Sequence, residues 1–165
     1  MLLALKNYVY IWQSNFSKEM DKILEKHGYT LITLPWETFE LLENDQDHFT
    51  QSGYEKFLYS LGETLLPYGK NKKILILSDS TIGYWNTDSK IVLQPFGICD
   101  MISCCGVGYT THPVNFRSTI WGLEQKYDIV VMIGGWNDGN TSLPLVDKSV
   151  RNFSRTIKKK LIFFN

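Results

Sequence analysis

Four segments of the chain carry side chains suited to acyl transfer. Ser78–Gly83 offers hydroxyls, Asp45–His48 offers carboxylates and an imidazole, and Gly134–Asp138 offers an amide. Cys105–Thr110 adds glycines, whose backbone N–H groups can approach a ligand closely. A serine becomes a nucleophile when a neighbouring base takes its proton, and N–H donors stabilise the oxyanion that results. Together these residue types predict a hydrolase that needs no cofactor and no metal ion.

The elements between these segments alternate helix and strand. Short apolar or β-branched runs predict strands, and apolar side chains at helical spacing predict the helices. Strands separated by helices form a parallel sheet with helices on both faces, a three-layer α/β/α sandwich. The predicted strands are Tyr29–Leu34, Ile74–Leu77, a weaker one within 90–105, Asp128–Ile133 and Leu161–Phe164. The predicted helices are Trp12–Leu24, Tyr54–Leu65, Pro113–Leu123 and Val146–Ile157.

The four polar segments are expected to meet at one edge of this sheet. Ligands of an open parallel sheet bind beyond the carboxyl ends of its strands. Ser78–Gly83 and Gly134–Asp138 directly follow buried strands, and Cys105–Thr110 adjoins the weaker one. Asp45–His48 comes after the strand Tyr29–Leu34, past a short helix or loop. The sequence therefore predicts a site at the carboxyl edge.

These segments resemble the sequence blocks of the SGNH/GDSL hydrolases. The Gly-Asp-Ser-x-x-x-Gly block is matched by Ser78–Gly83, with serine in place of the first glycine. Gly135–Asp138 matches Gly-x-Asn-Asp, Asp45–His48 matches Asp-x-x-His, and Gly108 best fits the loose glycine block. The resemblance covers nearly the whole chain. It implies one domain over residues 1–165 with a central parallel, flavodoxin-like five-stranded sheet.

The order of the blocks departs from the family. The Asp-x-x-His block is last in the family, but here it precedes the serine block. A circular permutation accounts for this, because starting at about Lys70 and joining Asn165 to Met1 restores the usual order. Such cuts are tolerated in surface connections. Alternatively, the blocks meet across two chains that exchange elements.

The resemblance implies a Ser-His-Asp triad. Ser80 is the expected nucleophile, His48 the general base and Asp45 the group that orients His48. Asp47 is a nearby alternative to Asp45, but the Asp-x-x-His spacing favours Asp45. The competing interpretation of each residue alone is a cap, a turn or a solvated surface group.

The resemblance also implies an oxyanion hole. Its expected donors are the backbone N–H groups of Ser80 and Gly108 and the side-chain amide of Asn137. Gly106 competes with Gly108 for this role. Ser78, in place of the family's glycine, is expected to narrow the site or to alter the loop.

Aromatic side chains flank the predicted site and suggest a substrate wall. Tyr84, Trp85, Tyr109 and Trp136 could stack on a sugar ring or an acyl chain. The family resemblance makes small acyl esters the expected substrates, including acetyl groups on carbohydrates.

Composition excludes several other classes. Seventeen basic residues balance 17 acidic ones, which argues against a nucleic-acid binder. The three cysteines form no CxxC pair, so neither a disulfide framework nor a zinc ribbon fits. No apolar run is long enough for a membrane span. Met1–Leu5 is apolar but follows no basic residue and ends at Lys6, so we expect no signal peptide and a cytoplasmic protein.

Two other functions remain open on the sequence. A flavodoxin-like protein could use Ser78–Gly83 to hold the phosphate of FMN, although this leaves Gly135–Asp138 unexplained. A catalytically silent SGNH-like module could instead bind a glycan or a protein. Flavin absorbance would support the first, and ligand binding without turnover the second.

Overall fold

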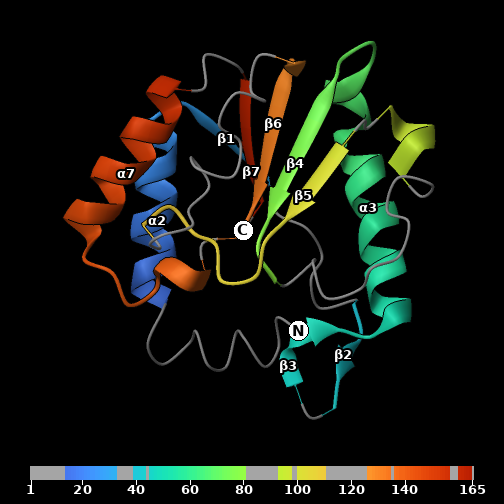
Figure 1. The fold of residues 1–165 in the computed structure, drawn as a ribbon, viewed down its shortest axis with the longest axis horizontal. Helices are drawn as coiled ribbons and strands as arrows, with labels where there is room; N and C mark the ends of the chain where they lie inside the picture. The colour runs from blue at the N-terminus through green and yellow to red at the C-terminus, as the bar shows by residue number, and fades with distance from the viewer. Residues whose placement is uncertain are drawn as a thin grey trace.

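A parallel sheet stands at the centre of the molecule (Figure 1). The computed structural model describes residues 14–32, 39–43, 45–80, 93–97, 100–110, 126–134, 136–156 and 160–164. The sheet joins β1, β7, β6, β4 and β5 in that order, and all neighbouring pairs are parallel. The strands are β1 (Tyr29–Ile32), β4 (Ile74–Ser78), β5 (Asp100–Ser103), β6 (Ile129–Ile133) and β7 (Lys160–Phe164). The predicted mixed α/β class is confirmed.

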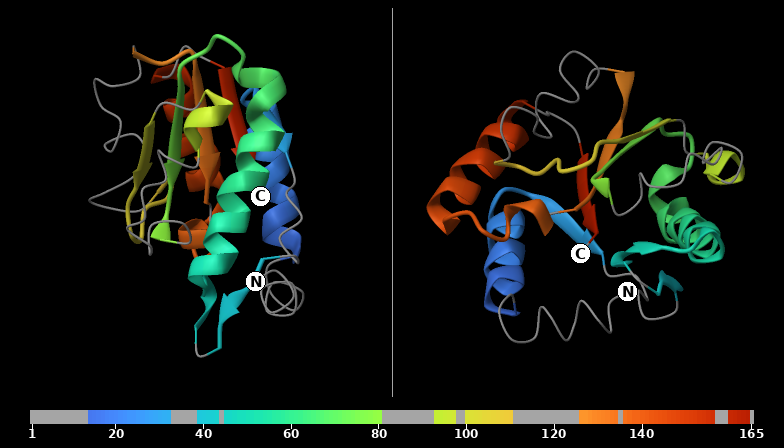
Figure 2. Two further views of the ribbon diagram at one scale, coloured as in Figure 1. Left: turned by 90° about the vertical axis from the view of Figure 1, so that its right-hand side faces the viewer. Right: turned by 60° about the horizontal axis from the view of Figure 1, so that its bottom comes forward.

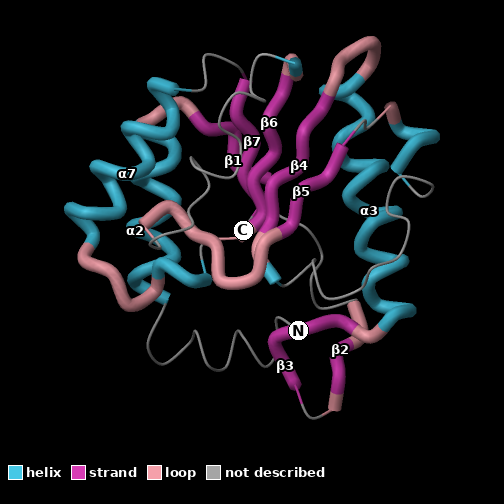
Figure 3. The backbone as a smooth tube through the Cα atoms, viewed as in Figure 1, coloured by secondary structure: helices cyan, strands magenta, loops and turns pink. Residues whose placement is uncertain are grey.

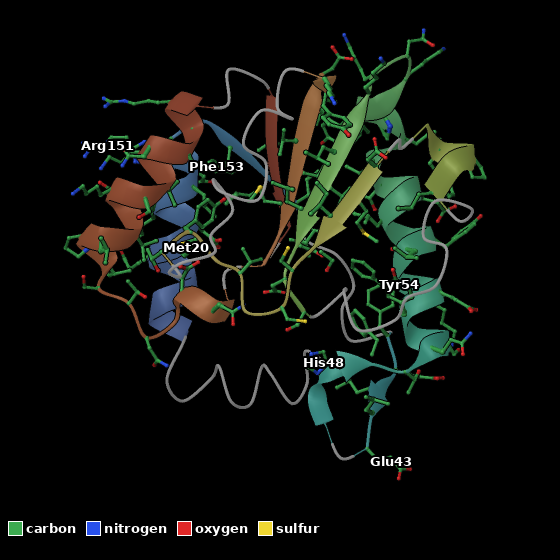
Figure 4. The ribbon with its side chains drawn as sticks, viewed as in Figure 1. Met20, Glu43, His48, Tyr54, Arg151 and Phe153 are labelled. Carbon is green, nitrogen blue, oxygen red and sulfur yellow. The ribbon has the colours of Figure 1, made fainter. Side chains whose placement is uncertain are left out.

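Helices cover both faces of this sheet (Figures 1 and 2). They are α2 (Ser14–Lys26), α3 (Gln51–Gly69) and α7 (Leu143–Thr156). All five residues of β4 and of β6 are buried, because their alternate side chains enter two different cores. Leu75, Leu77, Val130 and Met132 pack with α2 and α7, including Met20 and Phe153 (Figure 4). Ile74, Ile76, Ile129 and Val131 pack with α3.

The helix α3 begins at a polar cap and packs closely on the chain before it. The Thr50 Oγ1 accepts a hydrogen bond from the Gly53 N–H at 3.0 Å, which is an N-cap bond. A Cβ on Gly53 would lie 2.2 Å from the Glu40 carbonyl oxygen, so only glycine permits this approach. The helix continues through Pro67 to Gly69 and so extends beyond the predicted stretch Tyr54–Leu65.

A small antiparallel hairpin precedes α3 (Figure 3). It consists of β2 (Leu41–Leu42) and β3 (Asp45–Phe49). Leu41 pairs with Phe49 whereas Leu42 pairs with Asp45, so residues 46–48 bulge out of the ladder. The strand β2 lies in the stretch where the sequence predicted a short helix or loop, and β3 contains the Asp45–His48 segment itself.

Two short 3-10 turns complete the described elements. They are η2 (Gln94–Phe96) and η4 (Trp136–Asp138). The helix predicted over Pro113–Leu123 lies outside the described residues. None of the described helices is both long and apolar enough to cross a membrane.

Candidate functional site

The predicted site segments lie at one end of the molecule. The arrowheads of β4 and β5 point to that end, and the loop after β5, the turn η4 and the β2–β3 hairpin all lie there (Figures 1 and 2). This arrangement follows from the parallel strands, whose carboxyl ends share one edge.

Ser80 lies two residues beyond the end of β4. Hydrogen bonds to both neighbouring strands fix the chain just before it: the Asp79 N–H donates to the Ile133 carbonyl at 3.3 Å, and the Cys104 N–H donates to the Ser78 carbonyl at 3.0 Å. Ser80 itself is half-buried. Its hydroxyl makes no hydrogen bond to any residue that the structure describes.

Asp138 holds the glycine loop against the turn η4. Its carboxylate is fully buried and accepts three hydrogen bonds. The Tyr109 N–H and the Thr110 N–H donate at 2.9 Å each, and the Thr110 hydroxyl donates at 2.6 Å. The Thr110 hydroxyl also lies 3.1 Å from the Thr141 hydroxyl. A buried carboxylate bonded in this way fixes the loop backbone, because each bond to a charged acceptor is strong.

Among the buried residues of this loop, one backbone N–H group has no described acceptor. The Val107 N–H donates to the Cys104 carbonyl at 3.3 Å, and the N–H groups of residues 109 and 110 donate to Asp138. Gly108, although buried, has an N–H that bonds to nothing within the described part of the chain. Buried N–H groups are nearly always paired, so this donor is a candidate for ligand binding. Gly106, by contrast, is an exposed turn residue with φ of +71°.

Asn137 is positioned by the same loop. Its Nδ2 donates one hydrogen to the Val107 carbonyl at 2.9 Å. The amide carries a second hydrogen, for which the described residues offer no acceptor. Asn137 and Gly108 therefore belong to one hydrogen-bonded unit, and their role in an oxyanion hole stays a prediction.

His48 lies in the bulge of β3 and is half-buried. Figure 4 shows it at the end of the molecule where the carboxyl ends of β4 and β5 lie. A bulge can re-aim a side chain, so strand alternation does not decide which neighbour His48 meets. The backbone of Asp45 and Asp47 belongs to β3, but their side chains lie outside the described residues. The structure joins His48 and Ser80 by no hydrogen bond.

Tyr109 is a core residue, and its predicted place in a substrate wall is wrong. Only 5% of it is exposed, and its ring packs edge-on against those of Tyr29 and Phe153 at centroid distances of 6.2 and 5.7 Å. Burial raises the pKa of the Tyr109 phenol well above its ordinary value. The turn at Gly106 and the bonds to Asp138 direct this residue inward. The side chain of Trp136, with Tyr84 and Trp85, lies outside the described residues.

Ser78 is buried and contacts the neighbouring strand β5. It is 1% exposed, and its Oγ lies 2.7 Å from the Oγ of Ser103, its partner in the β4–β5 register. The sequence analysis did not identify Ser103, Thr110 or Asp138 as contributors to the site. Asp138 could have been recognised in the sequence, because a carboxylate beside a glycine-rich turn often accepts hydrogen bonds from backbone N–H groups.

Comparison with known proteins returned no match to this chain among protein families, curated proteins or solved structures. Within the described residues, no group of three or more His, Cys, Asp or Glu side chains could hold a metal ion. Any function assigned to the candidate site must therefore be argued from its residues and their geometry.

Proposed function

We propose that this chain is a serine esterase of the SGNH type, circularly permuted, which hydrolyses small acyl esters such as acetyl esters of carbohydrates. The observation that carries the proposal is that Ser80, Gly108 and Asn137 lie in the segments that follow β4, β5 and β6, and that the Gly108 N–H and the Asn137 amide are donors. Two such donors with no described acceptor suit the negative oxygen of a tetrahedral intermediate.

The order of the strands supports the permuted SGNH fold. Counted from β4 in chain order and continuing from β7 to β1, the sheet β1-β7-β6-β4-β5 becomes 5-4-3-1-2. Read from the other side, this is the flavodoxin-like order 2-1-3-4-5. Ligands of such sheets bind at the switch point between the first and third strands, which here are β4 and β6. Ser80 and Asn137 follow these two strands.

The proposed mechanism is acyl transfer in two steps. The Ser80 Oγ attacks the ester carbonyl carbon while His48 takes the hydroxyl proton, and Asp45 stabilises the imidazolium. The oxyanion accepts hydrogen bonds from the N–H groups of Ser80 and Gly108 and from Asn137. The intermediate collapses, and His48 protonates the departing alcohol. Water then attacks the acyl-serine, with His48 again as the base, and releases the acid. The mechanism requires Ser80 and His48 to form a hydrogen bond when substrate binds, since catalytic hydrogen bonds are often absent or long before substrate is bound.

Labelling with a fluorophosphonate tests the proposal without knowledge of the substrate. The probe reacts with activated serines, so we expect covalent labelling of the wild-type protein, none of Ser80→Ala, and a strong reduction in His48→Ala. His27→Ala is the matched control, because the His27 Nε2 lies 2.9 Å from the Asp147 Oδ1 of α7 and belongs to none of the predicted site segments. It should label at the wild-type rate once folding is confirmed by circular dichroism.

Asn137 tests the oxyanion hole separately. We expect Asn137→Ala to lower kcat for 4-nitrophenyl acetate by about 100- to 1,000-fold, the usual cost of one such donor. The exposed Asn140, on the same turn, provides the control Asn140→Ala, which should retain activity. Well-folded wild-type protein that neither labels nor hydrolyses the ester would refute the proposal. Flavin absorbance or glycan binding would then indicate one of the other two functions.

A further inference from the structure

Two serine hydroxyls converge on the peptide that precedes Ser80. The Ser103 Oγ donates to the Asp79 carbonyl at 2.9 Å, and the Ser78 Oγ lies 3.3 Å from the same oxygen. The two hydroxyl oxygens are themselves 2.7 Å apart. Ser78 is buried and Ser103 half-buried, so these contacts are at least partly shielded from water.

The distances define a direction for the hydrogen bonds. Two hydroxyls have two hydrogens for three contacts. The shorter pair of contacts forms a chain in which Ser78 donates to Ser103 and Ser103 donates to the Asp79 carbonyl. Ser103 is therefore the direct donor, and Ser78 orients it.

Fixing the Asp79 carbonyl also fixes the Ser80 N–H. The two groups belong to one peptide plane, and in a trans peptide they point in opposite directions. The hydroxyls hold the carbonyl on the β5 side of the chain. The Ser80 N–H is thereby aimed away from β5, and rotation of this peptide would break the bond from Ser103.

We propose that Ser78 and Ser103 are positioning residues, which aim the Ser80 N–H at the oxyanion. The inference rests on the proposed esterase function. It gives a role to the serine that stands in place of the first glycine of the block. The Ser78 hydroxyl orients Ser103, which holds the peptide between Asp79 and the nucleophile Ser80. Neither hydroxyl contacts substrate in this arrangement.

Steady-state kinetics with 4-nitrophenyl acetate test the inference on the full chain. Deleting an oxyanion donor costs about 100- to 1,000-fold in kcat, so loosening one should cost less, and we expect about tenfold for Ser103→Ala. Ser78→Ala should have a smaller effect, because Ser103 keeps its bond to the carbonyl. KM should stay within about twofold, since the lost interaction forms only in the transition state.

Ser154→Ala is the matched control. The Ser154 Oγ donates to the Val150 carbonyl at 2.9 Å within α7, so the same chemical group and the same kind of bond are removed there. Its kcat should equal that of the wild type. The pH dependence of kcat should be unchanged in Ser103→Ala, because the substitution does not touch His48.

The amide proton shift of Ser80, measured by ¹H–¹⁵N NMR, reports the peptide geometry without turnover. It should move in Ser103→Ala and stay in Ser154→Ala. An unchanged shift together with unchanged kcat in Ser103→Ala overturns the inference alone. A wild-type protein that neither labels with fluorophosphonate nor turns over overturns the proposed function, and the catalytic part of this inference with it. In that case the amide shift still decides the geometric part.

Discussion

Asp138→Asn is the sharpest perturbation of the candidate site. The substitution keeps the shape of a fully buried side chain and replaces one carboxylate oxygen by an NH₂ group. The least costly orientation puts this NH₂ at the Oδ2 position, where it faces the Tyr109 N–H. The remaining oxygen still accepts from the N–H and hydroxyl of Thr110, but it has lost its charge.

The expected loss of stability is about 3 kcal/mol. Leaving the Tyr109 N–H unsatisfied costs about 1–3 kcal/mol, and each bond that changes from a charged to a neutral acceptor loses up to about 1 kcal/mol. A domain of this size has a free energy of unfolding of about 5–15 kcal/mol, so the loss is a large fraction of the whole. With a urea m-value of about 2 kcal/mol/M, the unfolding midpoint should fall by about 1.5 M.

Urea unfolding followed by circular dichroism measures this effect. Thr110→Val is the matched control, because it removes one of the three donors and leaves the carboxylate intact. It should cost about 1 kcal/mol. A midpoint for Asp138→Asn no lower than that of Thr110→Val would refute the argument that this carboxylate organises the loop. Labelling by fluorophosphonate should also slow in Asp138→Asn, because Gly108 lies in the loop that is released.

Two further substitutions probe the contacts around the site and between the helices. In Gly53→Ala the new Cβ would lie 2.2 Å from the Glu40 carbonyl oxygen and displace the hairpin that carries His48. We therefore expect the free energy of unfolding, measured in urea, to fall by about 1–3 kcal/mol. The kcat should fall as well. The pKa of Asp147 is lowered below 3.8 by hydrogen bonds from Lys26 and His27. The ionised Asp147 carboxylate therefore stabilises the folded protein fully at neutral pH, and this contribution disappears as the pH falls through the lowered pKa. Asp147→Asn should reduce the free energy of unfolding by under about 1 kcal/mol at pH 7 and leave it unchanged at strongly acidic pH. Equal unfolding midpoints at pH 7 would contradict this.

The central strands and the three described α-helices were predictable from the sequence. The apolar runs in β4 and β6 are continuous because both faces of these strands are buried. Gly28 follows α2 with φ of +85°, a conformation that favours glycine at the end of a helix. The polar segments were then located by position alone, since each follows a strand.

The hairpin and the inward direction of Tyr109 could not be predicted. β2 has two residues, and β3 is polar and bulged, so neither shows the alternation that identifies a strand. Tyr109 follows two glycines, which is typical of an exposed loop. It is buried because Asp138 binds its N–H from 29 positions along the chain, a contact that no local pattern reveals.

The two halves of the candidate site are built differently, and this separates the effects of mutations. The proposed oxyanion half consists of Gly108 and Asn137: the buried Asp138 carboxylate accepts from the N–H groups of the two residues after Gly108, and the Asn137 amide donates to the Val107 carbonyl. The proposed general base, His48, lies on the bulged hairpin. Glu40, directly before this hairpin, packs against Gly53 at the start of α3. Substitutions in the loop should therefore change kcat at every pH, because they act on the oxyanion. Substitutions in the hairpin should shift the pH profile as well, because they act on the group that carries the proton.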